Sequence, residues 1–423
     1  MKLNRVILPA AVAVLLAGGP LVAQEVSELS GEDRPLNANF EELFSVGSFD
    51  GADWETFGEI AGLAFDTEGN LHIFDRQNSR VVVVDRDGSF VREVGRPGEG
   101  PGELRMPLEF TVLRDGTTVV ADMGHRAYSL FGADGVYERM VTMGGDGGMI
   151  RVGDMQADPT GRAVISGGGG MRIQMGPGGG PAPTTRPIER ISLQGEDAVA
   201  EVVADGWLPP RDDQPTELTG GGATIRMSMA GPRTFEPGLF AGALPDGGVA
   251  YADTSTYAVK IVDAGGTLQR VLRRPFQPRP VTEAIEEAEK ERQLADLEVG
   301  DGPTMRIITQ GPGGQRGQVS GDAIKEMMRG RIDAMEFYPE LSVIQDLSTG
   351  WEGTIWVERR GAEPVGPGAI DLLKADGSYV GSFDPGETEI PEAFGPDGLV
   401  AYTVTDEFDV PTVVVRRLPE PIR

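Results

Sequence analysis

The sequence predicts an all-β fold, a six-bladed β-propeller with a small helical insertion and an N-terminal strand that closes the last blade. The first observation behind this prediction is a spacing, because three turn glycines are each followed by another turn glycine 19 residues later. The pairs are Gly69 and Gly88, Gly116 and Gly135, and Gly247 and Gly266. The second observation is that short β-rich runs flank these turns, as they do in hairpins. A repeat of about 40 to 50 residues with four strands is typical of propeller blades.

A third observation, the number of recurring turns, sets the number of blades at six. The inner hairpin turns contain Gly69, Gly116, Gly161, Gly247, Gly353 and Gly398. The outer hairpin turns repeat one phrase, Asp-Gly-Ser-Phe at 87–90, Asp-Gly-Val-Tyr at 134–137, Gly-Gly-Thr-Leu at 265–268 and Asp-Gly-Ser-Tyr at 376–379. Glycine allows the positive φ of such turns, and the apolar residue that follows starts the outer strand.

The sixth blade lacks an outer strand of its own after the run at 411–418. The stretch Phe40–Gly47, which precedes the first blade, has the composition of a strand and could fill this place. We therefore expect it to complete the last blade and close the ring, which removes the exposed sheet edges that would otherwise aggregate.

The repeat resembles the NHL-repeat, or TolB-like, branch of the six-bladed propellers. The resemblance is strongest over residues 57–104, in the loop sequence of residues 75–80 and the glycine-rich segment 94–102. The second blade keeps Asp122 and the Asp-Gly turn but has His125 where the first has Asn78. Later blades keep only the turns and the rhythm of the strands. Asp75 and Asn78 are better interpreted as side chains that cap their own loop than as ligands of a bound molecule.

Residues 1–23 have the pattern of a secretory signal peptide, with Lys2 and Arg5 before an apolar run and Ala23 near the expected cleavage point. The apolar run is too short for a confident transmembrane helix. The chain has no cysteine, so neither a lipidated N-terminal cysteine nor a disulfide framework is expected. We predict a mature propeller at 24–423 in the periplasm or outside the cell, with no transmembrane anchor.

The charge of the mature chain excludes one class of partner. Without Lys2 and Arg5 it has 36 basic and 66 acidic residues, a net charge of 36 − 66 = −30. Such a surface repels phosphate backbones, so nucleic acid is not an expected partner. It suits divalent cations or cationic ligands, although a solvated acidic shell that maintains solubility is the simpler interpretation.

Three insertions interrupt the repeat, at 167–187, 207–237 and 275–338. Loops after the second strand of a blade and loops between blades emerge on the same face, so we expect all three to surround one mouth of the central channel. Such loops commonly carry binding sites. The residues that we expect to bind a ligand there are Trp207, Arg226, Met227 and Met229 in the second insertion, with His125 in a neighbouring loop.

Each insertion also contains one short phrase in which apolar and polar residues alternate. It starts with Met-Arg-Ile at 171 and 305 and with Ile-Arg-Met at 225. We hypothesise that the three phrases form one accessory sheet over the mouth; the alternative is three unrelated loops of low order. The third insertion additionally predicts two helices, over 281–297 and 321–335, because Thr282 and Asp322 are suitable N-caps followed by helical sequence.

Acidic residues occur near the start of each predicted innermost strand: Glu59, Glu109, Asp154, Glu236, Glu340 and Glu392. Carboxylates that project into the channel would offer the oxygen ligands that calcium prefers. Their spacings to the turn glycine differ, so they cannot all occupy equivalent positions. Glu109 and Asp154 share a spacing of seven residues and form the predicted metal-binding pair, with calcium as the cofactor.

The sequence favours binding over catalysis. Six-bladed propellers include calcium-dependent lactonases with asparagine ligands and amidating lyases with histidine-ligated zinc, but this chain has no asparagine after Asn78 and only His72 and His125. No phosphate-binding loop or nucleophilic serine motif is present, so no catalytic residue is assigned. We predict a non-catalytic scaffold that binds a ligand, a protein or an extracellular polymer through its loop face. The alternative is a calcium-dependent, lactonase-like hydrolase with a carboxylate metal site in the channel.

Overall fold

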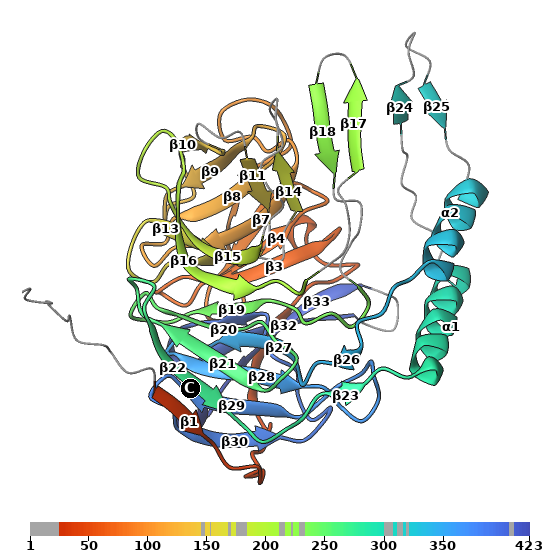
Figure 1. Cartoon of the computed structure of the whole chain (residues 1–423). Helices are drawn as coiled ribbons and strands as arrows, with labels where there is room; N and C mark the ends of the chain where they lie inside the picture. Colours follow the sequence, from red (N-terminus) through yellow and green to blue (C-terminus); the bar gives the residue numbers. More distant parts are fainter. Residues whose placement is uncertain are drawn as a thin grey trace, which may run out of the picture.

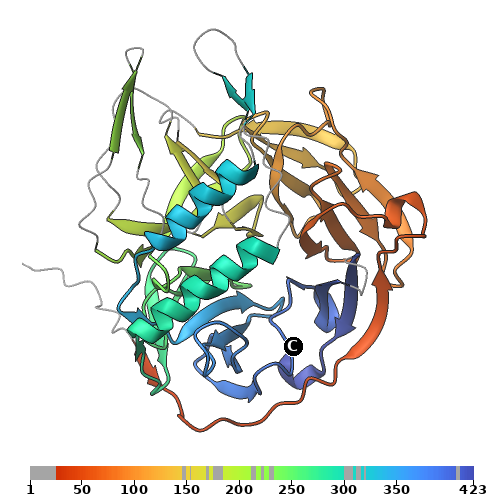
Figure 2. The ribbon, with the colours of Figure 1, turned by 90° about the vertical axis from the view of Figure 1, so that its right-hand side faces the viewer.

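The protein is described from a computed structural model, in which six small antiparallel sheets form a ring (Figures 1 and 2). The described residues are 25–144, 149–152, 154–167, 171–174, 184–210, 216–220, 223–227, 233–299, 308–310, 316–318, 321–405 and 410–423. The predicted signal peptide at 1–23 lies outside them. The predicted all-β, six-bladed propeller is confirmed.

Each blade is a four-stranded antiparallel meander, with its first strand at the centre of the ring. Blade 1 contains β3 (Ile60–Phe65), β4 (Leu71–Asp75), β5 (Arg80–Val84) and β6 (Phe90–Val94). Blade 2 contains β7 (Pro107–Val112), β8 (Thr118–Asp122), β9 (Ala127–Phe131) and β10 (Tyr137–Thr142). Blade 3 contains β12 (Met155–Ala157), β13 (Ala163–Ser166), β15 (Thr185–Ser192) and β16 (Val199–Trp207).

The second half of the ring follows the same plan. Blade 4 contains β19 (Phe240–Ala243), β20 (Val249–Ala252), β21 (Ala258–Val262) and β22 (Leu268–Arg273). Blade 5 contains β27 (Ile344–Thr349), β28 (Thr354–Arg359), β29 (Ile370–Lys374) and β30 (Tyr379–Phe383). Blade 6 contains β31 (Ala393–Phe394), β32 (Leu399–Thr405), β33 (Pro411–Arg417) and the N-terminal β2 (Glu41–Val46).

The ring is closed by pairing between the two ends of the described chain. β2 runs antiparallel to β33, with Val46 opposite Val413, and becomes the outer strand of blade 6. Gly88, in a hairpin turn of blade 1, has a φ of +80°, and a Cβ at this position would lie 2.7 Å from Phe44 of β2. The closing strand therefore packs on the turn of the neighbouring blade. A second N-terminal strand, β1 (Glu25–Glu28), adds to blade 4 parallel to β22.

The insertions contain secondary structure of their own. Two helices, α1 (Glu283–Val299) and α2 (Gly321–Asp333), lie in front of the ring in Figure 2, in the connection between blades 4 and 5. We call this side, where the connections between blades emerge, the helix face, and the opposite side, with the inner hairpin turns, the turn face. Two short strands, β23 (Arg279–Pro280) and β26 (Glu340–Leu341), pair where this insertion leaves and rejoins the propeller.

The hypothesis of one shared accessory sheet is wrong. The three alternating phrases fall in three separate two-stranded sheets, because each phrase pairs with a strand near it in sequence. The pairs are β11 (Met149–Val152) with β14 (Met171–Gln174), β17 (Thr216–Gly220) with β18 (Ala223–Met227), and β24 (Ile308–Gln310) with β25 (Arg316–Gln318). Local hairpins close short loops and so cost less chain entropy than pairing across three insertions.

A buried ion network joins the N-terminal segment to blades 4 and 5. Asp371 of β29 is fully buried and lies 2.8 Å from the Arg274 guanidinium and 3.2 Å from that of Arg359. The same two arginines contact Asp33, at 2.8 and 2.6 Å, in the segment that follows β1. Ser382 also donates a hydrogen bond to Asp371. Because two guanidinium groups are held by two carboxylates, the network fixes the N-terminal segment against the blades.

We predict that Asp371→Ala lowers the free energy of unfolding by about 3–5 kcal/mol, because it leaves Arg274 and Arg359 without their shared buried partner. Urea denaturation measures this effect. Glu363→Ala, an exposed position in the same blade, is the matched control and should change stability by less than about 0.5 kcal/mol. Equal effects of the two substitutions would show that the buried network does not contribute to stability.

Candidate functional site

The central channel is the principal candidate site, because the first strands of all six blades line it. It contains a cavity of about 190 Å³, bordered by residues of β3, β7, β12, β19, β27 and β31 together with the residues next to them. Its walls combine apolar side chains, among them Phe65, Val112 and Met155, with polar ones that include Thr111 and Gln156. Such a hollow offers the concave surface on which small-molecule sites are usually built.

Carboxylates from three different parts of the chain gather at the helix-face end of the channel. Glu109 lies early in β7, Asp154 directly precedes β12 and Asp346 lies early in β27. Burial and the nearby charge of Asp154 raise the pKa of Glu109 to about 7, although Arg76 opposes this shift. Burial also raises the pKa of Asp346, and the charges of Glu358 and Asp154 add to this increase. Asp154 therefore lies within electrostatic reach of both half-buried carboxyls.

The six acids near the starts of the predicted inner strands do not all lie at the channel, as their unequal spacings predicted. Glu236 is paired with Arg233 at 3.0 Å, and Glu340 lies in β26, where it accepts a hydrogen bond from Ser255. Glu340 is displaced from the channel because β26 belongs to the insertion and blade 5 begins at Ile344. Asp346, which the sequence analysis did not single out, is the acid of blade 5 at the channel.

Two further acids of that set have partners close to them. Glu59 forms an ion pair with Arg76 on the helix face. Glu392 borders the cavity, but its oxygens accept hydrogen bonds from the backbone and hydroxyl of Thr403, at 2.8 and 2.9 Å. Glu109 and Asp154, the predicted metal pair, differ from these neighbours, because neither forms an ion pair with a cationic side chain of the described residues.

His125 is held inside its own loop. Its Nδ1 lies 2.7 Å from Asp122, and the same carboxylate accepts backbone hydrogen bonds from Arg105, Met106 and Gly124. Burial alone would raise the pKa of Asp122, but these hydrogen bonds and His125 lower it overall. The predicted ligand-binding role of His125 has no direct support here, because its imidazole already has a structural partner.

Asp75 plays the same part in blade 1. It is fully buried and accepts hydrogen bonds from the backbone of Gly58 and Glu59 and from the side chains of Asn78 and Arg80. The interpretation of Asp75 and Asn78 as loop-capping residues agrees with this arrangement. His72 is also buried, 3.2 Å from the Thr118 hydroxyl, and burial lowers its pKa.

The predicted binding residues of the second insertion are only partly within the described structure. Trp207, at the end of β16, has a half-exposed side chain, and its backbone N–H donates to Asp253. Arg226 and Met227 belong to β18, paired with Glu217 and Thr216, and their side chains are not described. Met229 lies outside the described residues. These residues remain predicted ligand contacts.

At the turn-face end, the side chain of an arginine reaches across the channel. Arg114 follows β7 of blade 2, and its guanidinium carbon lies 3.2 Å from the centre of the Trp351 ring in blade 5. It also donates a hydrogen bond of 3.3 Å to the Trp351 carbonyl. Blades 2 and 5 are opposite each other in the ring, so this contact crosses its diameter. Sequence analysis missed Arg114, since an arginine beside an Asp-Gly turn ordinarily indicates an exposed loop.

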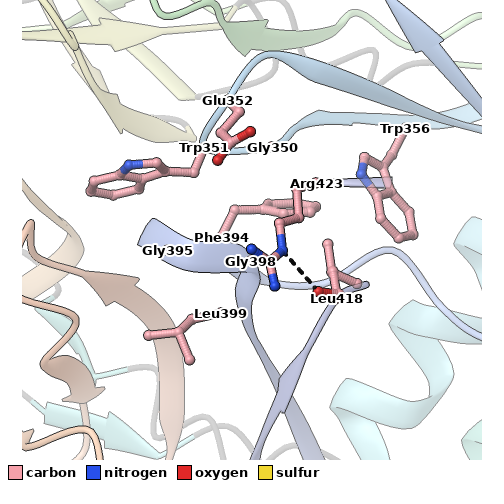
Figure 3. A pocket seen from close by; sticks show the side chains of 10 residues that line it. All are labelled: Gly350, Trp351, Glu352, Trp356, Phe394, Gly395, Gly398, Leu399, Leu418 and Arg423. Atoms are coloured by element: carbon pink, nitrogen blue, oxygen red, sulfur yellow. Dashed lines mark hydrogen bonds between the residues drawn. The ribbon is translucent and has the colours of Figure 1, made fainter. Parts of the chain in front are cut away.

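A second hollow near Trp351 is too small to be a ligand site. Figure 3 shows Trp351 and Trp356 on opposite sides of it, with Arg423 between them and hydrogen bonded to the Leu418 carbonyl. Its volume of about 10 Å³ could hold one water molecule at most. Trp356 is fully buried, 5.6 Å from Phe383. It belongs to the core, whereas Trp351 also borders the channel.

No group of three or more histidine or acidic side chains in the part of the chain that the structure describes is arranged to hold a metal ion. No described helix is sufficiently long and apolar to cross a membrane.

Comparison with known proteins supports the fold. A family model described as a 6-bladed beta-propeller matches residues 52–141, which comprise blades 1 and 2. No curated protein matches the sequence.

Among solved structures, the chain is similar to a protein of Bacteroides fragilis described as exported, with 11% identity, a TM-score of 0.46 and coverage of 93% of this chain and 99% of that one. A DUF4221-family member from Bacteroides vulgatus has 10% identity, a TM-score of 0.47 and coverage of 89% and 96%. A gluconolactonase from Xanthomonas campestris has 12% identity, a TM-score of 0.40 and coverage of 92% and 94%. Likenesses at this level carry no argument about function.

We predict that Glu109→Gln stabilises the protein at pH 8 but not at pH 4.5. The folded-state pKa of about 7 exceeds the ordinary value of 4.5, so between these pH values the folded protein keeps a proton that the unfolded chain releases. Raising the pH through this window therefore destabilises the wild type, and glutamine removes the penalty. We expect a gain of about 1 kcal/mol at pH 8, discounted for partial exposure. Urea denaturation at both pH values measures it, and a gain that does not depend on pH would contradict the assignment.

We also predict that Asp122→Ala destabilises the protein by about 2–4 kcal/mol, because it leaves several backbone N–H groups of the blade-2 loop without an acceptor. Asp134→Ala, in an exposed turn of the same blade, is the control and should cost about 1 kcal/mol or less. Thermal denaturation compares the two, and similar losses would argue against a special role for Asp122.

Proposed function

We propose that this protein is a non-catalytic propeller that binds a cationic ligand, or a basic segment of a partner protein or extracellular polymer, at the helix-face mouth of its channel. The observation that carries the proposal is a group of carboxyls that are half-buried there. Burial raises the pKa of both Glu109 and Asp346, and the nearby charge of Asp154 raises it further. A bound cation would relieve the repulsion between these carboxyls, so the mouth favours a positively charged group.

The charge of the surrounding face supports the same class of partner. Helix α1 contains seven acidic and two basic residues, a balance of 2 − 7 = −5. Most of its side chains are exposed, so this charge faces solvent on the helix face. Oppositely charged surfaces accelerate association and orient the partner before contact.

The insertions on this face are joined to one another, which supports a shaped binding surface. Thr234 of the second insertion exchanges backbone hydrogen bonds with Glu336 and Tyr338 of the third, at 2.8 and 2.9 Å. Phe235 lies 5.9 Å from Phe337, and Arg233 lies over the Tyr338 ring. These contacts hold the second and third insertions together where they join the propeller. The insertions can therefore present a binding surface that loses little conformational entropy when a partner binds.

We further propose that the protein acts in the periplasm or outside the cell and that its blades are of the NHL-repeat type. The support is the signal-peptide pattern of residues 1–23 and the loop sequence that begins at Asp75. The buried hydrogen bonds of Asp75 give this loop sequence a physical reason, because they attach the loop to the strand that precedes it.

A calcium-dependent hydrolase of the lactonase kind is the second candidate function. The electrostatic interaction between Glu109 and Asp154 favours it, since calcium would neutralise two carboxylates held close together. Calcium would bind through their oxygens and could polarise a substrate carbonyl.

We predict that hexalysine binds the wild type at low salt and binds more tightly as the pH rises from 6 to 8, because Glu109 ionises in this range. Glu109→Gln with Asp346→Asn should weaken binding at least fivefold in calorimetric titration. The matched control, Glu68→Gln with Asp87→Asn, removes two exposed charges from the turn face and should bind as the wild type does. Equal affinity of the two double variants would overturn the proposed mouth.

Titration of calcium into chelator-treated protein separates the two candidate functions. Saturable binding that is lost in both Glu109→Gln and Asp154→Asn would support the metal site and the hydrolase. If calcium gives the wild type no more heat than dilution does, the calcium-dependent hydrolase is excluded and the binding scaffold is the remaining candidate function.

A further inference from the structure

We propose that the cavity in the channel binds a small monocarboxylate, whose carboxylate group pairs with Arg114 at the turn-face end. This site is separate from the acidic mouth and does not depend on the function proposed for it. Three features support the assignment: the charge balance of Arg114, the way its side chain is oriented, and the size and lining of the cavity.

The guanidinium of Arg114 is a half-buried charge that lacks an anionic partner. Among the described residues, none forms an ion pair with it, and burial lowers its pKa to about 10, so it remains charged at neutral pH. Within the described residues, no carboxylate lies near enough to raise that pKa again. A partly desolvated charge without a counterion gains most from an anion that enters its pocket.

Trp351 holds Arg114 in place without using most of its hydrogen-bonding capacity. The ring lies against one face of the guanidinium, and the Trp351 carbonyl accepts one hydrogen bond from it. A guanidinium has five N–H donors in a planar fork, so the edge that remains can bind a carboxylate with two parallel bonds. Stacking thus orients the fork before a ligand arrives, which reduces the entropy lost on binding.

The cavity limits the rest of the ligand to a compact group that can contact both apolar and polar walls. Its volume of about 190 Å³ is somewhat larger than the roughly 150 Å³ that accepts benzene in an apolar protein cavity. Phe65 and Val112 are buried residues of its wall. The hydroxyls of Thr111 and Ser348 also line it, and neither is hydrogen bonded to another residue in the described part of the chain, so both can bind a polar substituent.

A single negative charge fits the channel better than two. Among the described residues, the charged groups that border the cavity are Arg114 and Glu392. The Glu392 carboxylate already accepts hydrogen bonds from Thr403. One guanidinium balances one carboxylate, whereas a dianion such as phosphate would keep an excess negative charge in a chain that is already strongly acidic. The preferred class is therefore a monocarboxylate with a body about the size of one aromatic ring.

Calorimetric titration with benzoate tests this proposal, with benzamide and benzylamine as neutral and cationic probes of the same size. We expect saturable binding of benzoate to the wild type and at least tenfold weaker binding of the other two. Arg114→Gln should weaken benzoate binding at least tenfold, and Arg114→Lys should restore part of it. Arg273→Gln, an exposed arginine on the outer strand of blade 4, is the matched control and should leave binding unchanged.

The outcomes distinguish a binding site from a structural contact. If Arg114 only joins blade 2 to blade 5, benzoate gives no saturable heat with the wild type, and Arg114→Gln lowers the melting temperature without any effect on binding. The absence of saturable heat with the wild type overturns the proposal. Benzoate binding that survives in folded Arg114→Gln overturns it as well. If Arg114→Gln does not fold, the comparison of the three probes on the wild type still decides, because equal binding of benzoate and benzamide would exclude a carboxylate-specific site.

Discussion

Closure of the ring by β2 and β33 is the constraint on which the rest of the structure depends. Without β2, the outer edge of blade 6 would expose the unpaired backbone groups of β33, and the turn of blade 1 would lose the packing of Phe44 against it. Phe44 of β2 packs where Gly88 leaves room for it, so the closing strand secures both blades. Only a closed ring brings the six inner strands together around one channel, and the charged groups at both of its ends depend on that arrangement.

The ring also explains why the two ends of the channel differ in charge. Inner strands of a meander all run in the same direction along the axis, so their first residues meet at the helix face and their last residues meet at the turn face. Glu109 and Arg114 lie five positions apart on the blade-2 strand and its extension, which separates them by roughly 16 Å. The carboxylates consequently interact with one another at one end, while the guanidinium interacts with the Trp351 ring at the other.

The sequence predicts the repeated features of the fold well, because each depends on neighbours in the chain. The hairpin turns follow from their glycines, and the hydrogen bonds of Asp75 follow from a loop motif only a few residues long. It predicts the site less well, since contacts between distant blades have no local pattern. Asp346 was missed because an inserted strand pair moved the start of blade 5 past Glu340. Arg114 and Trp351 are 237 residues apart and meet only across the closed ring.

The claim that connects fold and function is that the closed ring holds mutually repelling carboxyls at the mouth of the channel. NMR titration of the glutamate side-chain carboxyls, with Glu109 assigned by its absence in Glu109→Gln, measures the pKa that burial and this repulsion together raise. The account predicts a pKa of about 7 for Glu109 that falls when hexalysine is added. A pKa near the ordinary value of 4.5, unchanged by the cationic probe, would contradict it.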